Sequence, residues 1–177
     1  MNNFFFLTGP NNPSLGAARL EGSARYLRNL LATPEYVAAW TPITFIVASG
    51  QVCDYQPNNA GARLCSGRLQ AVLDRGRTDV DAVQWLPTMV IEAGGQALPY
   101  WILHFPIAHD VLDKKKTTFV PDTDLILKPY FDRGLIERHR IFTFPDAALG
   151  VIVRQDIKNA VIEAGCTGVD FIPALVG

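Results

Sequence analysis

The sequence lacks the features that define membrane-spanning and secreted proteins. None of its apolar runs approaches the roughly 20 residues that a membrane-spanning helix needs. The opening MNNFFFLTGP has only a short apolar run and no basic flank, so it does not fit the pattern of a secretory signal. We therefore expect a soluble protein, and we expect this opening to form a first, short strand.

The sequence also lacks an excess of charge of one sign. Its 16 lysine and arginine residues nearly balance 17 aspartate and glutamate residues, which gives a formal net charge of -1. A nearly neutral chain gives no electrostatic reason to expect a nucleic acid or an anionic membrane surface as a partner.

Cysteine is scarce, and its spacing does not suggest a structural role. Cys53, Cys65 and Cys166 are odd in number and contain no C-x-x-C pair. This pattern argues against both a disulfide framework and a zinc site. Reduced thiols are the simplest interpretation, and they predict a cytoplasmic protein.

Motifs that bind phosphates or activate a nucleophile are absent as well. The chain contains no G-x-S-x-G, no G-x-x-x-x-G-K-[ST] and no G-x-G-x-x-G sequence. The lysine run at 114–116 is typical of a solvated loop, with an anion site as the alternative. We therefore expect neither a cofactor nor a catalytic centre of a common kind.

Apolar periodicity predicts an α+β fold, in which a mainly antiparallel sheet is flanked by helices. Helical patterns begin near Gly22-Ser23, at residue 66 and at residue 155, and Thr33-Pro34 is a start signal for a short helix that ends near Trp40. The later strand-like segments are 41–49, 81–93, 98–109, 125–131, 138–144, 150–154 and 168–173.

One helix-turn-strand pattern occurs twice. AVLDRG and VQWLP at 71–76 and 83–87 are repeated as AVIEAG and VDFIP at 160–165 and 169–173. We predict that each helix is followed by a strand in the same relation to the sheet and that the two units superimpose. Gly76 and Gly165 suit the left-handed position after a helix. Within such a unit Cys166 is a small buried side chain, unless a histidine lies beside it in space.

His109 and Asp110, with His104 and Asp113 close in sequence, form the densest cluster of possible metal ligands or acid-base groups. Metal sites of this kind need further histidines, and only His139 remains. His104 and His109 are separated by an odd number of residues, so along a strand they point to opposite faces. We expect His104 to lie within the sheet and His109-Asp110 to end the strand, with a metal site as the alternative.

A series of segments between residues 61 and 173 has a recognisable order. AVLDRG, VQWLP and YWILHFPIAHDVLDKKKTTF are followed by LILKPYF, HRIFTFP, GVIVRQDIKNAVIEAG and CTGVDFIP. This order resembles a family of bacterial immunity proteins, the immunity-eleven family, whose genes lie beside those of polymorphic or contact-delivered toxins. The closing stretch is the most specific, because the helix, Gly165, Thr167-Gly168 and Phe171 match together.

The resemblance implies an α+β protein that neutralises one cognate toxin by binding it, without catalysis or a cofactor. It is compatible with a single domain over 1–177, in which residues 1–60 form an N-terminal α/β part with no recognised match. Two alternatives remain. One is a small metal-dependent hydrolase that reverses a toxin's modification and uses His104, His109, Asp110 and His139, and the other is a non-catalytic adaptor domain.

Residues 118–137 are where we expect a partner to bind. Neighbouring residues of a strand face opposite ways, so Tyr130 and Phe131 cannot both enter one core. An aromatic side chain at the surface among charges is typical of tight interfaces. The alternative is that the second ring packs under a neighbouring loop. The predicted partner-binding residues are Asp122, Asp124, Tyr130, Asp132 and Arg133.

Overall fold

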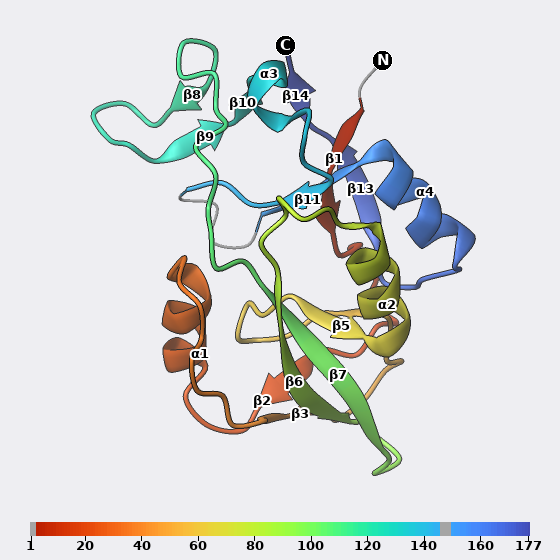
Figure 1. The fold of residues 1–177 in the computed structure, drawn as a ribbon. Helices are drawn as coiled ribbons and strands as arrows, with labels where there is room; N and C mark the ends of the chain where they lie inside the picture. Colours follow the sequence, from red (N-terminus) through yellow and green to blue (C-terminus); the bar gives the residue numbers. More distant parts are fainter. Residues whose placement is uncertain (1–2, 146–149) are drawn as a thin grey trace.

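A computed structural model describes residues 3–145 and 150–177, and it has the expected α+β architecture (Figure 1). The larger sheet is six-stranded, and all its neighbouring strands are antiparallel except β3 and β6. In spatial order its strands are β2 (Ala18–Leu20), β3 (Thr44–Val47), β6 (Gln84–Ile91), β7 (Ala97–His104), β5 (Leu64–Ser66) and β4 (Tyr55–Gln56). The predicted hairpin is confirmed, since β6 pairs with β7 along its whole length.

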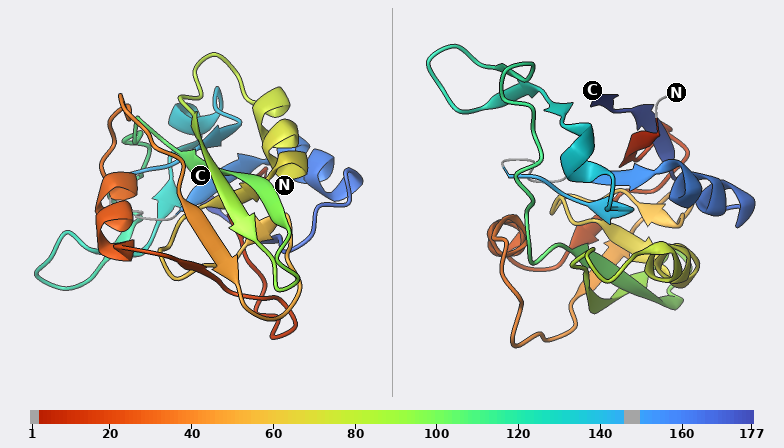
Figure 2. Two further views of the ribbon diagram at one scale, coloured as in Figure 1. Left: turned by 90° about the horizontal axis from the view of Figure 1, so that it is seen from below. Right: turned by 45° about the horizontal axis from the view of Figure 1, so that its top comes forward.

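The smaller sheet joins the two ends of the chain. It is antiparallel, and its order is β11 (Ile141–Phe142), β12 (Val151–Arg154), β1 (Phe4–Thr8) and β13 (Asp170–Pro173). The first strand therefore lies between two strands from the C-terminal part of the chain. Figure 2 shows the N- and C-terminal ends of the described chain close together in its right-hand view.

Among the residues that the structure describes, three of the four helices coincide with predicted helical segments. They are α1 (Ala24–Ala32), α2 (Gly67–Gly76) and α4 (Gln155–Glu163), whereas the short α3 (Arg133–Ile136) was not predicted. Helix α1 begins near Gly22-Ser23, as the sequence predicted, and the Ser23 side chain caps it by accepting a hydrogen bond from the backbone N of Tyr26.

The short helix predicted from Pro34 to Trp40 is wrong, because this segment is irregular. Thr33 is the C-cap of α1 and does not begin a second helix. The backbone of Val37 is instead satisfied by the Gln84 side chain on β6. Gln84 Oε1 accepts from the Val37 backbone N at 2.9 Å, and Gln84 Nε2 donates to the Val37 carbonyl oxygen at 2.9 Å. Trp40 also donates its indole N–H to the Pro87 carbonyl oxygen at 2.7 Å.

The two helix-turn-strand units are both present, but the prediction that their strands stand in the same relation to the sheet is wrong. β6 lies inside the larger sheet, whereas β13 is an edge strand of the smaller sheet. Gly165 has a φ of 66°, as predicted for a left-handed position. For Gly76 that prediction is wrong, since Gly76 is the last residue of α2. The Ile157 side chain of α4 occupies the space that a Cβ at Gly76 would need, so this glycine lets the two helices approach closely.

The strand predicted at 125–131 is divided at Pro129, which cannot donate a backbone hydrogen bond. Before it, β9 (Ile126–Lys128) pairs with β8 (Thr118–Phe119). After it, β10 (Tyr130–Phe131) pairs in parallel with β14 (Leu175–Val176). The hairpin of β8 and β9 consequently extends outside both main sheets (Figure 1).

The buried apolar side chains form three clusters. The first lies under α2 and α4, the second lies between α1 and the larger sheet, and the third lies around β10, α3 and β11. Within the described residues no helix is both long and apolar enough to cross a membrane.

Candidate functional site

Residues 110–137, which we call the projecting segment, connect β7 to β11 and include the β8–β9 hairpin, β10 and α3. In Figure 1 the hairpin extends at the upper left, and α4 lies at the right of the molecule. All five residues predicted to bind a partner belong to this segment, and the structure places them at two locations. Asp122 and Asp124 lie at the hairpin tip, whereas Tyr130, Asp132 and Arg133 lie at its base.

The hairpin is fixed to its base by a threonine. Thr117 Oγ1 donates to the carbonyl oxygen of Tyr130 at 3.2 Å and accepts from the backbone N of Tyr130 at 3.1 Å. At the tip, Asp122 has a φ of 60°, in the left-handed region that aspartate tolerates better than most residues. The carboxylates of Asp122 and Asp124 are exposed and form no ion pair within the part of the chain that the structure describes.

Tyr130 and Phe131 face opposite ways, as their strand positions require. Phe131 is completely buried, and its ring lies 5.2 Å from the ring of Phe144 and 6.0 Å from that of Phe6. Tyr130 is half-buried, and Lys116 Nζ lies 4.9 Å from the centre of its ring. Tyr130 is therefore the ring of this pair that a partner can reach.

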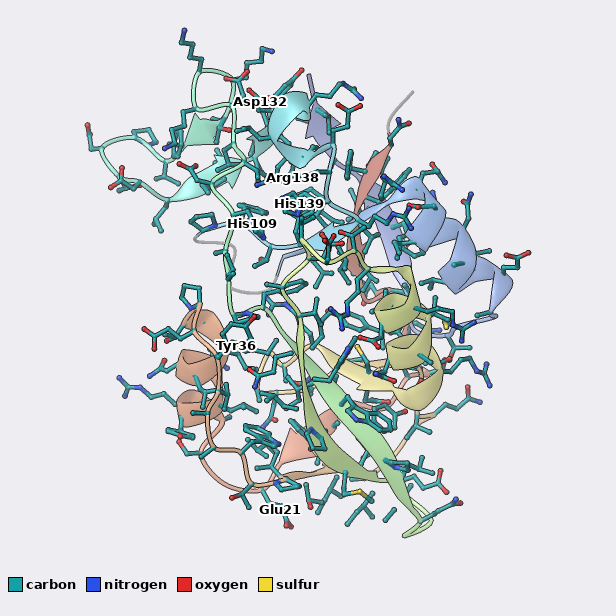
Figure 3. All side chains as sticks on the ribbon, in the orientation of Figure 1. Glu21, Tyr36, His109, Asp132, Arg138 and His139 are labelled. Atoms are coloured by element: carbon teal, nitrogen blue, oxygen red, sulfur yellow. The ribbon has the colours of Figure 1, made fainter. Side chains whose placement is uncertain are left out.

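Asp132 has a structural role that the sequence interpretation missed. Its Oδ1 accepts hydrogen bonds from the backbone N atoms of Gly134 and Leu135, at 2.9 and 3.4 Å, so it caps α3 (Figure 3). Aspartate is among the preferred residues at this position, which is the signal that identifies the cap. Arg133 follows with an exposed side chain, and its backbone N donates to the carbonyl oxygen of Gly177 at 3.0 Å.

The segment also exposes leucines that were not among the predicted residues. Leu125 is 62% exposed, Leu127 67% and Leu135 48%. Leu125 and Leu127 lie on either side of the half-buried Ile126, and both of their side chains are exposed. This alternation was the signal in the sequence. Exposed leucines beside carboxylates and a tyrosine give the segment the mixed composition of a protein-binding surface.

The candidate acid-base residues do not converge on one point. His139 Nδ1 lies 3.1 Å from Asp81 Oδ1, and the His109 ring lies 4.3 Å from the His139 ring (Figure 3). His104 is elsewhere, with its Nε2 2.7 Å from the carbonyl oxygen of Glu35. Asp110 forms an exposed ion pair with a lysine. In the part of the chain that the structure describes, no group of three or more His, Cys, Asp or Glu residues could hold a metal ion.

The hydrogen bonds of His139 occupy both of its ring nitrogens. Arg138 Nε donates to Nε2 at 3.4 Å, which leaves the Nδ1 hydrogen to donate to the Asp81 carboxylate. His139 is 1% exposed and Asp81 is 1% exposed. The pair is thus engaged in holding the α2–β6 connection against the segment before β11.

Cys166 lies in the turn between α4 and β13 and packs against the first apolar cluster. Its backbone N donates to the Val161 carbonyl oxygen at 3.2 Å. Burial, with a smaller contribution from the Asp54 carboxylate, raises the pKa of the Cys166 thiol to about 11. At neutral pH the side chain is therefore a thiol and not the nucleophilic thiolate.

A comparison with known families matches residues 41–176 to the Imm11 immunity protein family. The chain belongs to this family. The match confirms the resemblance seen in the sequence and begins earlier than residue 61, so it includes every element from β3 to β14. β1, β2 and α1 precede the matched range. A comparison with curated proteins finds no match.

Proposed function

We propose that this Imm11 family member neutralises one cognate bacterial toxin by binding it directly, without catalysis and without a cofactor. The observation that carries the proposal is the family match over residues 41–176. In this proposal the chain acts in the cytoplasm, where its three free cysteines would stay reduced.

The projecting segment supplies the binding surface in this proposal. Asp122 and Asp124 offer carboxylates that form no ion pair among the described residues, and Tyr130 offers an aromatic ring beside Lys116. Asp132 positions α3 by capping it, which leaves the side chain of Arg133 at the surface. The exposed leucines of the hairpin add apolar area that a partner would bury.

Binding is favoured over hydrolysis because the four residues of the hydrolase hypothesis lie at different places. His109 and His139 are adjacent, but His104 contacts the backbone of Glu35, and Asp110 pairs with Lys114. A general base or a metal centre needs its groups within hydrogen-bond reach of one substrate.

Co-expression tests this function. The probe is the C-terminal domain of the protein encoded immediately upstream of the gene for this chain, produced from an inducible promoter in cells with or without the chain. We expect growth only in cells that contain the chain, and we expect the two proteins to co-purify as a stable complex. In the control, the cells produce the same toxin domain together with an immunity protein encoded beside an unrelated toxin. Protection without a complex, or no protection, would contradict the proposal.

A further inference from the structure

A pocket of about 380 Å³ lies between α1 and the irregular segment that follows it, and we call it the tyrosine pocket. Tyr26 and Leu30 line it from the helix, where residues four positions apart share one face. Glu35, Tyr36 and Val37 line it from the segment after the helix, on which Figure 3 labels Tyr36. The pocket therefore combines two aromatic rings with one carboxylate.

Packing and hydrogen bonds hold the tyrosine pocket in shape. Leu30 and Val37 pack against the second apolar cluster. The Gln84 side chain binds the backbone N and the carbonyl oxygen of Val37 at 2.9 Å each. His104 Nε2 lies 2.7 Å from the Glu35 carbonyl oxygen. The backbone is thus fixed both before and after the second tyrosine, so a partner meets a pocket that is already formed.

The polar groups of the pocket are not used by the rest of the described structure. Tyr26 is 68% exposed and Tyr36 66%, whereas the other three tyrosines are buried or half-buried. Neither of these two hydroxyl groups forms a hydrogen bond within residues 3–145 and 150–177. The exposed Glu35 carboxylate forms no hydrogen bond or ion pair there either. Two large aromatic side chains exposed in one pocket are more typical of an interface than of an ordinary surface.

The chemistry of the lining favours a cation. Glu35 is the only charged residue among the described residues that line the pocket. Arg25 and Arg28 of the same helix are not among these residues, and Arg28 Nη2 instead donates to the carbonyl oxygen of Asn59 at 3.2 Å. A carboxylate attracts a positive charge directly, and the face of a tyrosine ring attracts it through the quadrupole of the ring.

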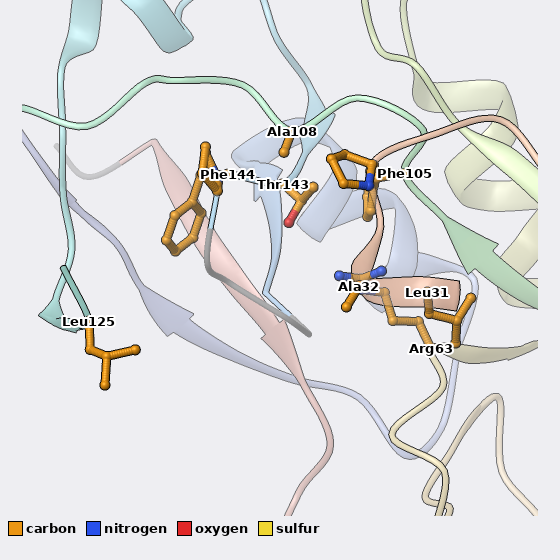
Figure 4. Close-up of a pocket in the computed structure, with 10 residues that line it drawn as sticks. Leu31, Ala32, Arg63, Phe105, Ala108, Leu125, Thr143 and Phe144 are labelled. Atoms are coloured by element: carbon orange, nitrogen blue, oxygen red, sulfur yellow. The ribbon is translucent and has the colours of Figure 1, made fainter. Parts of the chain in front are cut away.

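A larger cavity, of about 470 Å³, borders the same end of α1 but has the opposite charge (Figure 4). Leu31 and Pro34 line it from the α1 side, and Leu125 lines it from the projecting segment. Arg63 is the charged residue among the described residues that line it, so this cavity is unfavourable for a cation. Because Pro34 precedes Glu35 in the chain, the tyrosine pocket lies beside this cavity, within reach of a partner that contacts the projecting segment.

Resting on the function proposed above, we propose that the tyrosine pocket binds an arginine side chain on the surface of the toxin. The guanidinium group pairs with Glu35 and contacts the ring faces of Tyr26 and Tyr36, whose hydroxyl oxygens are further acceptors. The methylene groups pack on Leu30 and Val37. A planar guanidinium both stacks on aromatic rings and donates several hydrogen bonds in one plane, which the compact ammonium group of lysine does not. Arginine is also among the residues most enriched at the energetic centres of interfaces.

Substitutions at the pocket test the charge and the rings separately. Glu35→Gln keeps the shape and removes the charge, and it should raise the Kd for the upstream toxin domain by about fivefold to tenfold at low salt. High salt should reduce this effect. Tyr36→Ala should raise the Kd by about tenfold or more, whereas Tyr36→Phe keeps the ring and should bind nearly as well as the unchanged chain. Glu163→Gln, at an exposed position on α4, is the matched control and should leave the Kd unchanged.

An arginine compound tests the pocket without the toxin. The probe is N-acetylarginine amide, and the control is N-acetylcitrulline amide, which has nearly the same shape but no charge. At about 10 mM, in the range where a single side chain binds, the arginine compound should shift the backbone amide resonances of Tyr26, Glu35 and Tyr36 in NMR spectra. The citrulline compound should shift them much less, and Glu35→Gln should remove the difference between the two compounds.

These outcomes separate the pocket from the function. If the unchanged chain does not bind the toxin domain, the proposed function is wrong, and the assignment of the pocket to a toxin arginine fails with it. If the unchanged chain binds, and Glu35→Gln and Tyr36→Ala bind as well as Glu163→Gln does, only the pocket proposal is overturned. Equal shifts from the arginine and citrulline compounds also overturn it.

Two other occupants of the pocket would contradict the proposal as well. A dimer of the chain alone, seen by sedimentation equilibrium and lost in Tyr36→Ala, would show that the pocket binds a second copy. A small molecule found in the purified chain by native mass spectrometry, and lost in Tyr36→Ala, would show that it binds a ligand of another kind. Melting temperatures verify folding, and Tyr26→Ala is a second ring variant if Tyr36→Ala fails to fold.

Discussion

Asp81 Oδ1 lies 3.1 Å from His139 Nδ1, and both side chains are almost completely excluded from solvent. The other carboxylate oxygen accepts from the backbone N of Thr78 at 2.8 Å and from its Oγ1 at 3.0 Å. The backbone N of Arg140 donates to the same carboxylate. One aspartate therefore satisfies donors from the α2–β6 connection and from the segment that precedes β11, and so joins the two main sheets.

Asp81→Ala should lower the free energy of unfolding by about 3 kcal/mol, because it leaves several buried donors without an acceptor. Urea denaturation would measure this change. Asp79→Ala is the matched control, since Asp79 is exposed two residues earlier in the same connection. Equal stability of the two variants would show that the buried carboxylate does not join the sheets as we infer.

Stability should fall as the solution becomes acidic. Burial lowers the pKa of His104 and of His109 below the ordinary value of 6.5, and the neighbouring His139 lowers the pKa of His109 further. As the pH falls below about 6.5, the unfolded chain binds protons that the folded chain does not, so the free energy of unfolding decreases until the folded-state pKa values are passed. His104 Nδ1 has no hydrogen-bond partner in the described part of the chain, so a proton there would be buried without an acceptor.

Urea denaturation at about pH 8 and about pH 5.5 tests this dependence. We expect a smaller free energy of unfolding at the lower pH, and we expect His109→Gln to reduce the difference because one of the two histidines is removed. Equal stability at the two pH values, or a larger value at the lower pH, would refute the account of these histidines.

Protection from the toxin should not depend on the candidate chemical groups. Cys166→Ala and the double change His109→Ala, Asp110→Asn should protect cells as well as the unchanged chain does, because binding and not catalysis is proposed. The co-expression assay measures this, with melting temperatures as a control for folding. The hydrolase hypothesis requires the opposite: lost protection at an unchanged melting temperature, with the toxin still bound.

The long periodic elements of the fold could be predicted from the sequence, because local residues determine them. The α2 helix, α4 and the β6–β7 hairpin have strong patterns and clear turn signals. The segment 34–40 contains a start signal for a helix, but it is irregular in the structure. Its Val37 backbone forms hydrogen bonds with Gln84 of β6, which is distant in sequence, so no local pattern could reveal them. The strand β14 is two residues long, and its partner β10 is remote in sequence, so no local pattern reveals it.

The candidate site could be predicted only in part for a similar reason. Strand alternation predicts that the Tyr130 and Phe131 side chains point to opposite faces. Which of the two rings is buried depends on packing against Phe6 and Phe144, which come from distant segments. Asp132 carries a cap signal that is hard to recognise because α3 is only 4 residues long. The cavity lined by Leu31, Pro34 and Leu125 has no counterpart in any local pattern, because these residues come near one another only in the folded chain.

Asp132 allows capping to be separated from partner binding. Asp132→Ala removes the acceptor for Gly134 N and Leu135 N, so it should cost about 1 kcal/mol of stability. Asp132→Asn keeps a good cap and should cost much less, although it removes the negative charge. If the charge faces the toxin, both variants weaken binding, and if Asp132 only caps α3, Asp132→Asn binds normally. Thermal unfolding and binding assays on the same samples would measure the two effects.

The most direct test is titration calorimetry of the purified chain with the purified upstream toxin domain. The account predicts a saturable complex, and it predicts that Tyr130→Ala weakens the binding free energy by about 2 kcal/mol, the usual threshold for an interface anchor. Tyr130→Phe, which keeps the ring, should retain most of the affinity. Absence of binding by the unchanged chain, or unchanged affinity for the alanine variants at Tyr130, Asp132 and Asp124, would contradict the account.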